Sequence, residues 1–508
     1  MELLPFGDLP PYKPRAFVPA DFKVSGWDAI EPLFDQLETD LDACGCSESL
    51  EAWLLKVSEL GAILDEDGSR RYIAMTCHTS KEEAKGAYLD FVENIEPHLK
   101  ERFFQLAKKF VNHPQRAHLP AERYEILNRD WQSMVDLFRE ENVPLETEES
   151  KLGQQYQEKM GALTVEFQGE EKTLVQMGVY LQETDRTVRQ TAWELVANRR
   201  LEVAAECDRQ FDELKDLRIQ IAGNAGYGDY RDFKHTAKGR FDYQPADCFK
   251  FHEAVEKVVM PAYNELLADR RSKLDLDKLR PWDTSVDPDG LEPLKPFCEV
   301  EDMVAKTKGI FDHVDDELAA GFQTMRDQSL LDLANRKGKA PGGYQSSLPE
   351  ARLPFIFMNA VGLQRDVETL LHEAGHAFHT LAAQGEDIHE YQHAPLEFCE
   401  VASMSMELVG NEHLEEFYSS EDCVRARQQH LEGIISLFPW IATIDAFQHW
   451  IYTHPTHNVE ERDAAWNGLL DRFGGDIDWS GYELARTKMW HRQSHIFLVP
   501  FYYIEYGI

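Results

Sequence analysis

Two histidines and a glutamate stand at a spacing that suits metal-assisted hydrolysis. The segment reads H-E-A-G-H, with His372, Glu373 and His376. Histidines at i and i+4 lie one turn apart on the same helix face, so both imidazoles can point at one Zn²⁺. Glu373 follows the first histidine directly, where it can hold a water molecule at the metal and take its proton. These side chains therefore predict a zinc site that can hydrolyse an amide bond.

A helix is expected to position this motif. Apolar residues recur through it at helical spacing: Val367, Leu370, Leu371, Ala374, Phe378 and Leu381. Asp366 is predicted to cap the N-terminus of the helix. Gly375 stands in its middle, where glycine costs about 1 kcal/mol relative to alanine, and this indicates the close approach of another backbone or a ligand. The alternative, a surface helix whose His and Glu face water, is disfavoured because the motif borders the apolar stripe.

A catalytic zinc needs a third protein ligand and one open position. The metzincin pattern, which would add a glycine and a third histidine, is excluded because His379 and Ala382 occupy those positions. Five later side chains remain as candidates: His389, Glu390, His393, Glu397 and Glu400. The two histidines also have i, i+4 spacing, but their Gly- and Pro-containing flanks indicate a loop, so we interpret them as exposed.

Glu400 is the preferred third ligand. It begins a helical stretch that continues to Leu408 and places Glu400, Ser403 and Glu407 on one face. A ligand on a second rigid helix gives the geometry that a metal site needs. Ser403 and Glu407 are then candidates to orient the ligands through hydrogen bonds, in a second shell around the metal. Glu397, one turn earlier on the same face, is the runner-up.

The C-terminal segment carries a second set of groups that can act on a carbonyl. His495 is followed by three tyrosines, Tyr502, Tyr503 and Tyr506. A tyrosine hydroxyl or a histidine N–H that points at the scissile carbonyl oxygen would stabilise the developing oxyanion. Aromatic core packing is the competing interpretation, and it must account for some of these rings.

These motifs resemble the oligoendopeptidase F and thimet oligopeptidase group of zinc metallopeptidases. The similarity reaches back to about residue 180, and the first 180 residues resemble the group only in helical character. The segments that carry it most clearly are Gly342-Gly343-Tyr344, Pro354-Phe355-Ile356-Phe357-Met358-Asn359, His372-Glu373-Ala374-Gly375-His376-Ala377-Phe378-His379, Phe398-Cys399-Glu400-Val401-Ala402-Ser403, His495-Ile496-Phe497 and Pro500-Phe501-Tyr502-Tyr503-Ile504-Glu505-Tyr506.

The resemblance implies a role for each matching side chain. His372, His376 and Glu400 would bind one Zn²⁺ per chain, and Glu373 would take the proton of the water. His379 would lie beside the ligands. Contacts to the substrate or the oxyanion would come from Tyr344, His495, Tyr502, Tyr503 and Tyr506. The resemblance further implies an endopeptidase that cuts internal bonds of short peptides, inside a deep channel between helical lobes.

The net charge of the chain limits the classes of partner that it can bind. The chain has a formal net charge of −38, from 91 Asp and Glu against 53 Lys and Arg. Such a surface repels phosphate backbones and anionic membranes, so nucleic acid and membrane partners are disfavoured. No apolar run reaches about 18 residues, the length of a spanning helix. Short peptides remain as the expected partner, and no sequence feature specifies an oligomeric state.

The eight cysteines favour a reducing compartment. Cys44 and Cys46 are too close for a usual zinc pair, and the other six are scattered. Unpatterned cysteines in a chain of this size are typical of the cytosol, where thiols stay reduced. The segment Met1-Glu2-Leu3-Leu4-Pro5 lacks the basic and apolar regions of a signal peptide. We therefore expect a cytoplasmic protein.

The periodicity predicts a mainly α, multi-lobed fold with a small β-sheet beside the zinc-motif helix. We expect an N-terminal helical lobe over 1–180 and a catalytic region over 181–508, with a proline-rich linker near 281–297. Leu353 to Asn359 is the best strand, and Pro354 indicates an edge position, where an extended substrate can pair. Residues 337–346 are expected to form a flexible loop.

Two other functions are compatible with the same residues. A carboxypeptidase with the same zinc centre would need a cation for the C-terminal carboxylate of its substrate, and Arg492 and Arg352 are the candidates. A peptide-binding protein with a vestigial site is the second alternative. The intact set of His372, Glu373, His376 and Glu400 argues against it.

Overall fold

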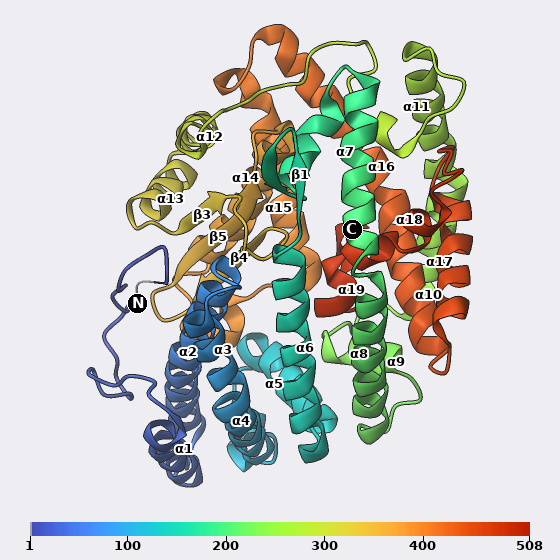
Figure 1. Cartoon of the computed structure of the whole chain (residues 1–508). Coiled ribbons are helices and arrows are strands. Elements are labelled where there is room, and N and C mark those ends of the chain that lie inside the picture. The colour runs from blue at the N-terminus through green and yellow to red at the C-terminus, as the bar shows by residue number, and fades with distance from the viewer. Residues whose placement is uncertain (1–2, 508) are drawn as a thin grey trace.

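Helices make up most of the chain, so the predicted mainly α fold class is confirmed. The computed structural model describes residues 3–507, in which two small sheets accompany the helices (Figure 1). The first helices are α1 (Trp27–Asp42), α2 (Ser47–Cys77), α3 (Glu82–Asn94), α4 (Glu96–Val111), α5 (Ala121–Leu137) and α6 (Val143–Gly161). Then come α7 (Arg186–Leu201), α8 (Ala204–Asn224), α9 (Tyr230–Ala237), α10 (Pro245–Ala254), α11 (Met260–Lys273), α12 (Val300–Val314) and α13 (Asp316–Asp327). The last are α14 (Gln364–Ala382), α15 (Leu396–Gly410), α16 (Ser420–Thr453), α17 (Val459–Phe473), α18 (Glu483–Thr487) and α19 (Ser494–Leu498).

The N-terminal helices α1 to α5 share one hydrophobic core, in the blue and cyan part of Figure 1. Trp53, Phe110 and Trp131 meet in that core, where the rings of Phe110 and Trp131 are 4.8 Å apart. Residues 143–161 pack mainly against α8, and Leu152 and Tyr156 belong to a second core that also contains Phe497. The boundary near residue 180 between two lobes stays a prediction.

The three-stranded sheet corrects the prediction for residues 353–359. Its strands are β3 (Leu331–Ala334), β4 (Tyr344–Leu348) and β5 (Leu353–Ala360), in the order β3-β5-β4, so β5 is central and not an edge strand. Pro354 is tolerated there because the pairing of β5 with β3 begins only at Ile356. The other sheet is the hairpin β1 (Thr164–Phe167) and β2 (Glu170–Thr173).

The free edge beside the zinc-motif helix belongs to β4. This strand pairs with β5 on one side only and packs against α14. The flexible loop predicted over 337–346 is therefore wrong at its end, because 344–346 pair with Phe357, Ile356 and Phe355. A short strand of mostly polar residues, Tyr344-Gln345-Ser346-Ser347-Leu348, carries little strand signal of its own, and the apolar β5 recruits it.

The zinc-motif helix α14 forms as its apolar stripe predicts. Val367, Leu370 and Ala374 are fully buried, between the sheet and α15. Its start differs from the prediction: the helix begins at Gln364, and Asp366 is not the cap. The Asp366 carboxylate instead reaches back and accepts hydrogen bonds from the N–H groups of residues 361–363, at 2.7 to 2.9 Å. It satisfies three free amides at the helix start at once.

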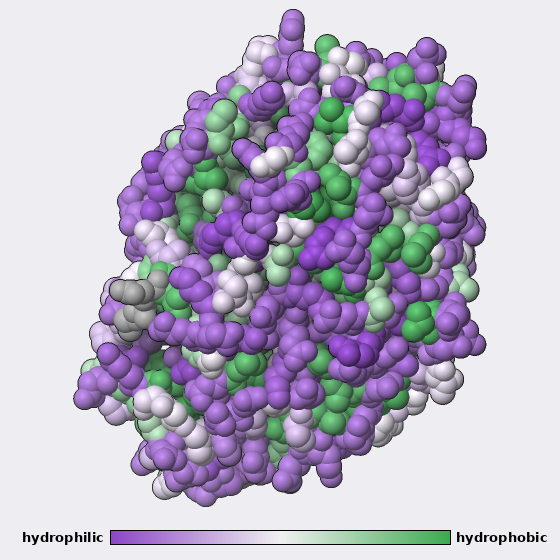
Figure 2. Space-filling model, in the orientation of Figure 1, coloured by the Kyte–Doolittle hydropathy of each residue, from purple (hydrophilic) through white to green (hydrophobic). Residues whose placement is uncertain are grey.

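A large cavity runs along the side of α14 that carries the motif. Its volume is about 1520 Å³, and residues of α7, β4, α14, α16 and the C-terminal segment line it. On the face that Figure 2 draws, hydrophilic residues predominate and apolar residues form small groups. Within the described residues no helix is both long and apolar enough to cross a membrane.

Candidate active site

Close packing of α14 against α15 brings the three predicted ligands together. Gly375 faces the backbone of α15, where a Cβ atom would lie 2.6 Å from the Ala402 carbonyl oxygen and from Ser403 Cα. The close approach that the mid-helix glycine predicted is thus confirmed. Any larger residue would push the two helices apart, and Glu400 on α15 would then move away from the histidines on α14.

The geometry of this group fits a catalytic metal. Glu400 Oε2 lies 3.4 Å from His372 Nε2 and 3.7 Å from His376 Nε2, and the three ligand atoms lie within 4.8 Å of one another. Two imidazole nitrogens and one carboxylate oxygen form the donor set of catalytic zinc sites. His372 also lines the cavity, so a fourth position would be open to it.

Hydrogen bonds hold two of these side chains, His372 and Glu400, from behind. The Ser403 hydroxyl donates to Glu400 Oε2 at 2.9 Å, and Glu407 Oε1 lies 2.7 Å from His372 Nδ1. The second oxygen of Glu407 contacts His430 Nε2 on α16, at 2.9 Å. Such contacts fix the ring orientation and leave His372 Nε2 free for a metal. His430 was not among the predicted residues, because only the fold brings α16 to the site.

Glu373 is buried beside this group with a free oxygen. It is 5% exposed, and its Oε2 has no hydrogen-bond partner among the described residues. Burial raises the pKa of Glu373 to about 7; the charges of Glu400 and Glu407 act in the same direction and His372 opposes them. Gly343 keeps a gap open at the other oxygen, since a Cβ there would lie 3.2 Å from Glu373 Oε1. The carboxylate can therefore receive a proton from the cavity side.

The C-terminal segment closes the group from the opposite side. Tyr502 Oη donates to Glu400 Oε1 at 2.5 Å, and so it holds the oxygen that does not face the histidines. His495 Nε2 lies 3.3 Å from Tyr506 Oη, and the ring of Tyr506 is 6.3 Å from that of His372. His495, Tyr503 and Tyr506 line the cavity. Of the three tyrosines, Tyr506 is therefore the one that both lines the cavity and places its ring beside a ligand histidine.

Other candidates lie further from the ligands. Tyr344 lines the cavity, but its hydroxyl is 2.6 Å from Thr76 Oγ1. His379 is half-buried on α14 and makes no hydrogen bond to the three ligand candidates within residues 3–507. Glu397 stands at the start of α15, outside the group of three.

His389 and His393 lie away from the cavity, in and just after the 3-10 turn 389–392. With Asp65 they form a separate group of potential ligands, in which His389 Nε2 is 3.4 Å from Asp65 Oδ2. Their predicted exposure is wrong for His389, which is half-buried against Gly61. Neither histidine contributes to the group around Glu400.

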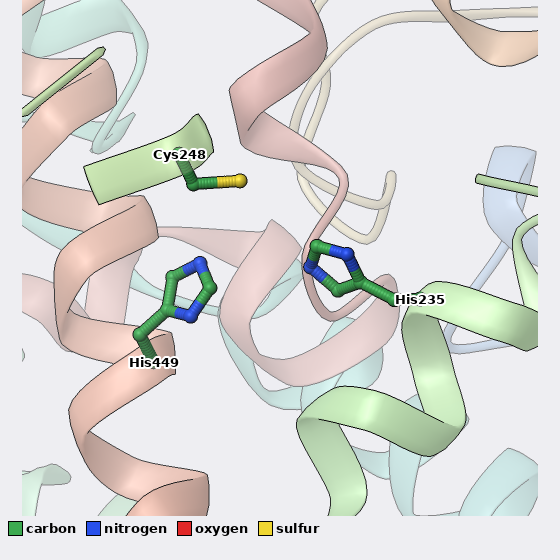
Figure 3. A group of neighbouring side chains, drawn as sticks. All are labelled: His235, Cys248 and His449. Atoms are coloured by element: carbon green, nitrogen blue, oxygen red, sulfur yellow. The ribbon is translucent and has the colours of Figure 1, made fainter. Parts of the chain in front are cut away.

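A third group of potential ligands is buried elsewhere. His235 of α9, Cys248 of α10 and His449 of α16 turn their side chains toward one another (Figure 3), and their ligand atoms lie within 4.8 Å. None of the three lines the large cavity. We therefore place the candidate active site at His372, Glu373, His376 and Glu400, where ligands, a buried carboxylate and the cavity coincide.

Comparisons with known proteins identify the family of the chain. The profile of Peptidase family M3 matches residues 179–508, and that of the Peptidase M3 N-terminal domain matches residues 17–138. The chain belongs to peptidase family M3. The resemblance that the sequence motifs indicated is thereby confirmed.

Solved structures share the fold over nearly the whole chain. A structure of PZ peptidase A with an inhibitor is 27% identical and has a TM-score of 0.92, covering 96% of this chain and 87% of that one. A protein from Bacillus anthracis str. Ames, assigned as an oligoendopeptidase F, is 26% identical with a TM-score of 0.86, covering 97% of this chain and 86% of that one. Among curated proteins, an oligoendopeptidase F homolog of Lactococcus lactis subsp. lactis (strain IL1403) is 22% identical over 260 residues, which span 49% of this chain and 41% of that protein.

Proposed function

We propose that this M3 peptidase is a zinc-dependent oligoendopeptidase of the cytoplasm that hydrolyses internal bonds of short peptides. The observation that carries the proposal is the convergence of His372, His376 and Glu400 beside the buried Glu373, in the wall of a large cavity. These residues would hold one Zn²⁺ per chain. When bound, the ion would supply activation of water and polarisation of the peptide carbonyl.

Glu373 would act as the base. Its free Oε2 can accept a proton from the attacking water, and the same carboxyl can then return the proton to the leaving amine. Burial raises the pKa of this carboxyl in the metal-free protein, and this favours the uptake of a proton. Ser403, Glu407 and Tyr502 would orient the ligands through the hydrogen bonds described above.

His495 and Tyr506 would stabilise the oxyanion. Both line the cavity beside His372, and each can donate a hydrogen bond to a carbonyl oxygen there. Tyr503 would contribute to the cavity wall, and Tyr344 would support the substrate strand from β4. His379, one turn beyond His376, would lie beside the ligands without binding the metal itself.

The cavity supports short peptides as the substrates. An extended peptide could add to the free edge of β4, which runs past Glu373 in the cavity wall. A cavity of about 1520 Å³ accommodates an oligopeptide but not a folded domain. Internal cuts in peptides of roughly five to twenty residues are therefore expected.

The proposal can be tested on a random peptide mixture. Zinc-loaded protein is incubated with the mixture, and the products are identified by mass spectrometry. Internal cuts in short peptides, with native proteins left intact, are the expected result. Exclusive release of single C-terminal residues would instead support a carboxypeptidase. Of its two candidate cations, Arg352 is bound to Asp387 away from the cavity, whereas Arg492 lines it. Binding without any hydrolysis would support a vestigial site.

A further inference from the structure

The arginines that lack an acidic partner are concentrated in the active-site cavity. In the described part of the chain, all but six of the 29 arginines have a carboxylate oxygen within 4.0 Å. Of the six, Arg116 and Arg139 donate to carbonyl and amide oxygens, and Arg326 is exposed on the surface. The other three are Arg200, Arg365 and Arg492, and all three line the large cavity.

These three side chains come from separate elements and converge on one region. Arg200 is in the last turn of α7, Arg365 in the first turn of α14, and Arg492 ends the 3-10 turn 489–492. The Arg492 guanidinium lies 5.4 Å from the centre of the Trp440 ring. Burial, followed by the charges of Arg200 and Arg365, lowers the pKa of Arg492 to about 9. Arg200 and Arg365 are thus each close enough to repel Arg492, although the protein carries a net charge of −38.

An anion that the three arginines share would stabilise such a cluster. Three guanidinium groups in a cavity wall, without an acidic partner, raise the free energy of the empty cavity through mutual repulsion. A carboxylate that enters would remove this repulsion and accept charge-assisted hydrogen bonds in the planar geometry that arginine favours. Three other arginines of the cavity wall are not free to bind an incoming carboxylate in this way. Arg270, Arg425 and Arg486 each already pair with a carboxylate of the protein.

We propose that Arg200, Arg365 and Arg492 form a subsite for a carboxylate of the peptide substrate. The inference rests on the proposed function and adds to it the charge of the preferred substrates. The carboxylate can come from the C-terminus of a short peptide or from an Asp or Glu side chain within it.

The position of Arg365 sets the distance between this subsite and the scissile bond. Arg365 and His372 are seven residues apart on α14, which places them on the same helix face and about 10 Å apart along its axis. An extended peptide covers that distance in roughly three residues. Allowing for the reach of an arginine side chain, the carboxylate would lie about two to four residues from the cut. A C-terminal carboxylate at that distance gives products of two to four residues, not the single residues that a carboxypeptidase releases.

The first experiment compares matched peptides. A quenched fluorescent peptide without acidic side chains is made with a free C-terminal carboxylate and as its C-terminal amide. Affinity is measured by titration into Glu373→Gln protein, and kcat/KM is measured with the unaltered protein. We expect the free acid to bind at least about tenfold more tightly than the amide. A further pair of amidated peptides, with Asp or Asn two to four residues from the cut, tests the side-chain source of the carboxylate.

Variants connect the preference to the three arginines. Arg365→Gln, Arg492→Gln and Arg200→Gln should each reduce the preference for the carboxylate, mainly through KM, while Arg326→Gln on the surface should leave it unchanged. Thermal unfolding of each variant checks the fold. Equal affinity for acid and amide, and for Asp and Asn, would overturn the subsite. If the unaltered protein hydrolysed no peptide, the proposed function would be contradicted instead. The affinities of the acid and the amide for Glu373→Gln protein would still test the subsite in that case.

Discussion

Within residues 3–507, two groups whose members are all buried or half-buried offer three potential metal ligands within 4.8 Å. One of the two has the features of an active site. The first is His372, His376 and Glu400. The second is His235, Cys248 and His449 (Figure 3). Residue type alone does not separate them, because each group combines two histidines with a third side chain that can bind a metal.

The surroundings of the two groups differ in access and in charge. His372 and Glu373 line the large cavity, whereas the second group lies outside its wall. At the second group, Arg240 Nη1 is 3.2 Å from His235 Nε2, and Asp445 is already bound to His252 at 2.8 Å. A guanidinium beside a ligand nitrogen repels a metal ion, and a paired carboxylate is less available to bind one. The comparison indicates that a metallopeptidase site needs its ligands to face open space without a competing cation.

The largest expected effect is the loss of activity in Glu373→Gln. Glutamine has nearly the same shape but cannot accept a proton, so turnover should fall by roughly 10²–10⁴. Metal content should stay at one per chain, because Glu373 is not among the ligands. Both quantities are measured on the same sample, with Glu397→Gln as the matched carboxylate control outside the group. Near-normal hydrolysis by the variant would remove Glu373 from the role of base.

Loss of an oxyanion donor should be the next largest effect. His495→Ala and Tyr506→Phe are each expected to lower kcat by roughly 10²–10³, and to change KM less, because the hydrogen bond strengthens only in the transition state. Tyr503→Phe, whose hydroxyl makes no hydrogen bond to the group, should have a smaller effect. Tyr502→Phe should weaken metal binding instead, since its hydroxyl holds Glu400. Normal kcat in all four variants would show that this segment is structural.

The sequence predicted the local parts of the site and missed the parts that depend on packing. The helix stripe, the mid-helix Gly375 and the helical face of Glu400 and Ser403 all appear in the structure as expected. His430 was missed because it lies in α16, far along the chain, and its spacing to Glu407 has no meaning before the helices pack. The edge strand was assigned to 353–359 for a similar reason, since strand order depends on partners that a single strand does not reveal.

Metal binding separates the two groups directly. Glu400→Ala should weaken zinc affinity at least roughly tenfold in a chelator competition, while Glu397→Ala should change it little. Cys248→Ser and His449→Gln should leave both affinity and stoichiometry unchanged, because their group is closed and faces Arg240. If the unaltered protein bound a second equivalent of metal and Cys248→Ser did not, the second group would be a metal site as well, and the contrast in metal binding between the two groups would be wrong. A stronger effect of Glu397→Ala than of Glu400→Ala would identify a different third ligand.

The smallest expected effect is a pH dependence of stability that belongs to the buried second group. Burial, followed by the charges of Arg240 and His449, lowers the pKa of His235 to about 3, against a partial opposing effect of Asp445. An unfolded histidine titrates near pH 6.5, so between about pH 6.5 and pH 3 the unfolded chain binds a proton that the folded protein does not. Stability must then fall as the pH falls through this window, by at most about 1.4 kcal/mol per pH unit for this group. Urea unfolding of metal-free protein between pH 7 and pH 4.5 measures the slope without a contribution from metal release. His235→Gln removes one titrating group and should reduce the slope, whereas His454→Gln, at an exposed position, should not. An unchanged slope in His235→Gln would show that the acid sensitivity arises elsewhere in the molecule.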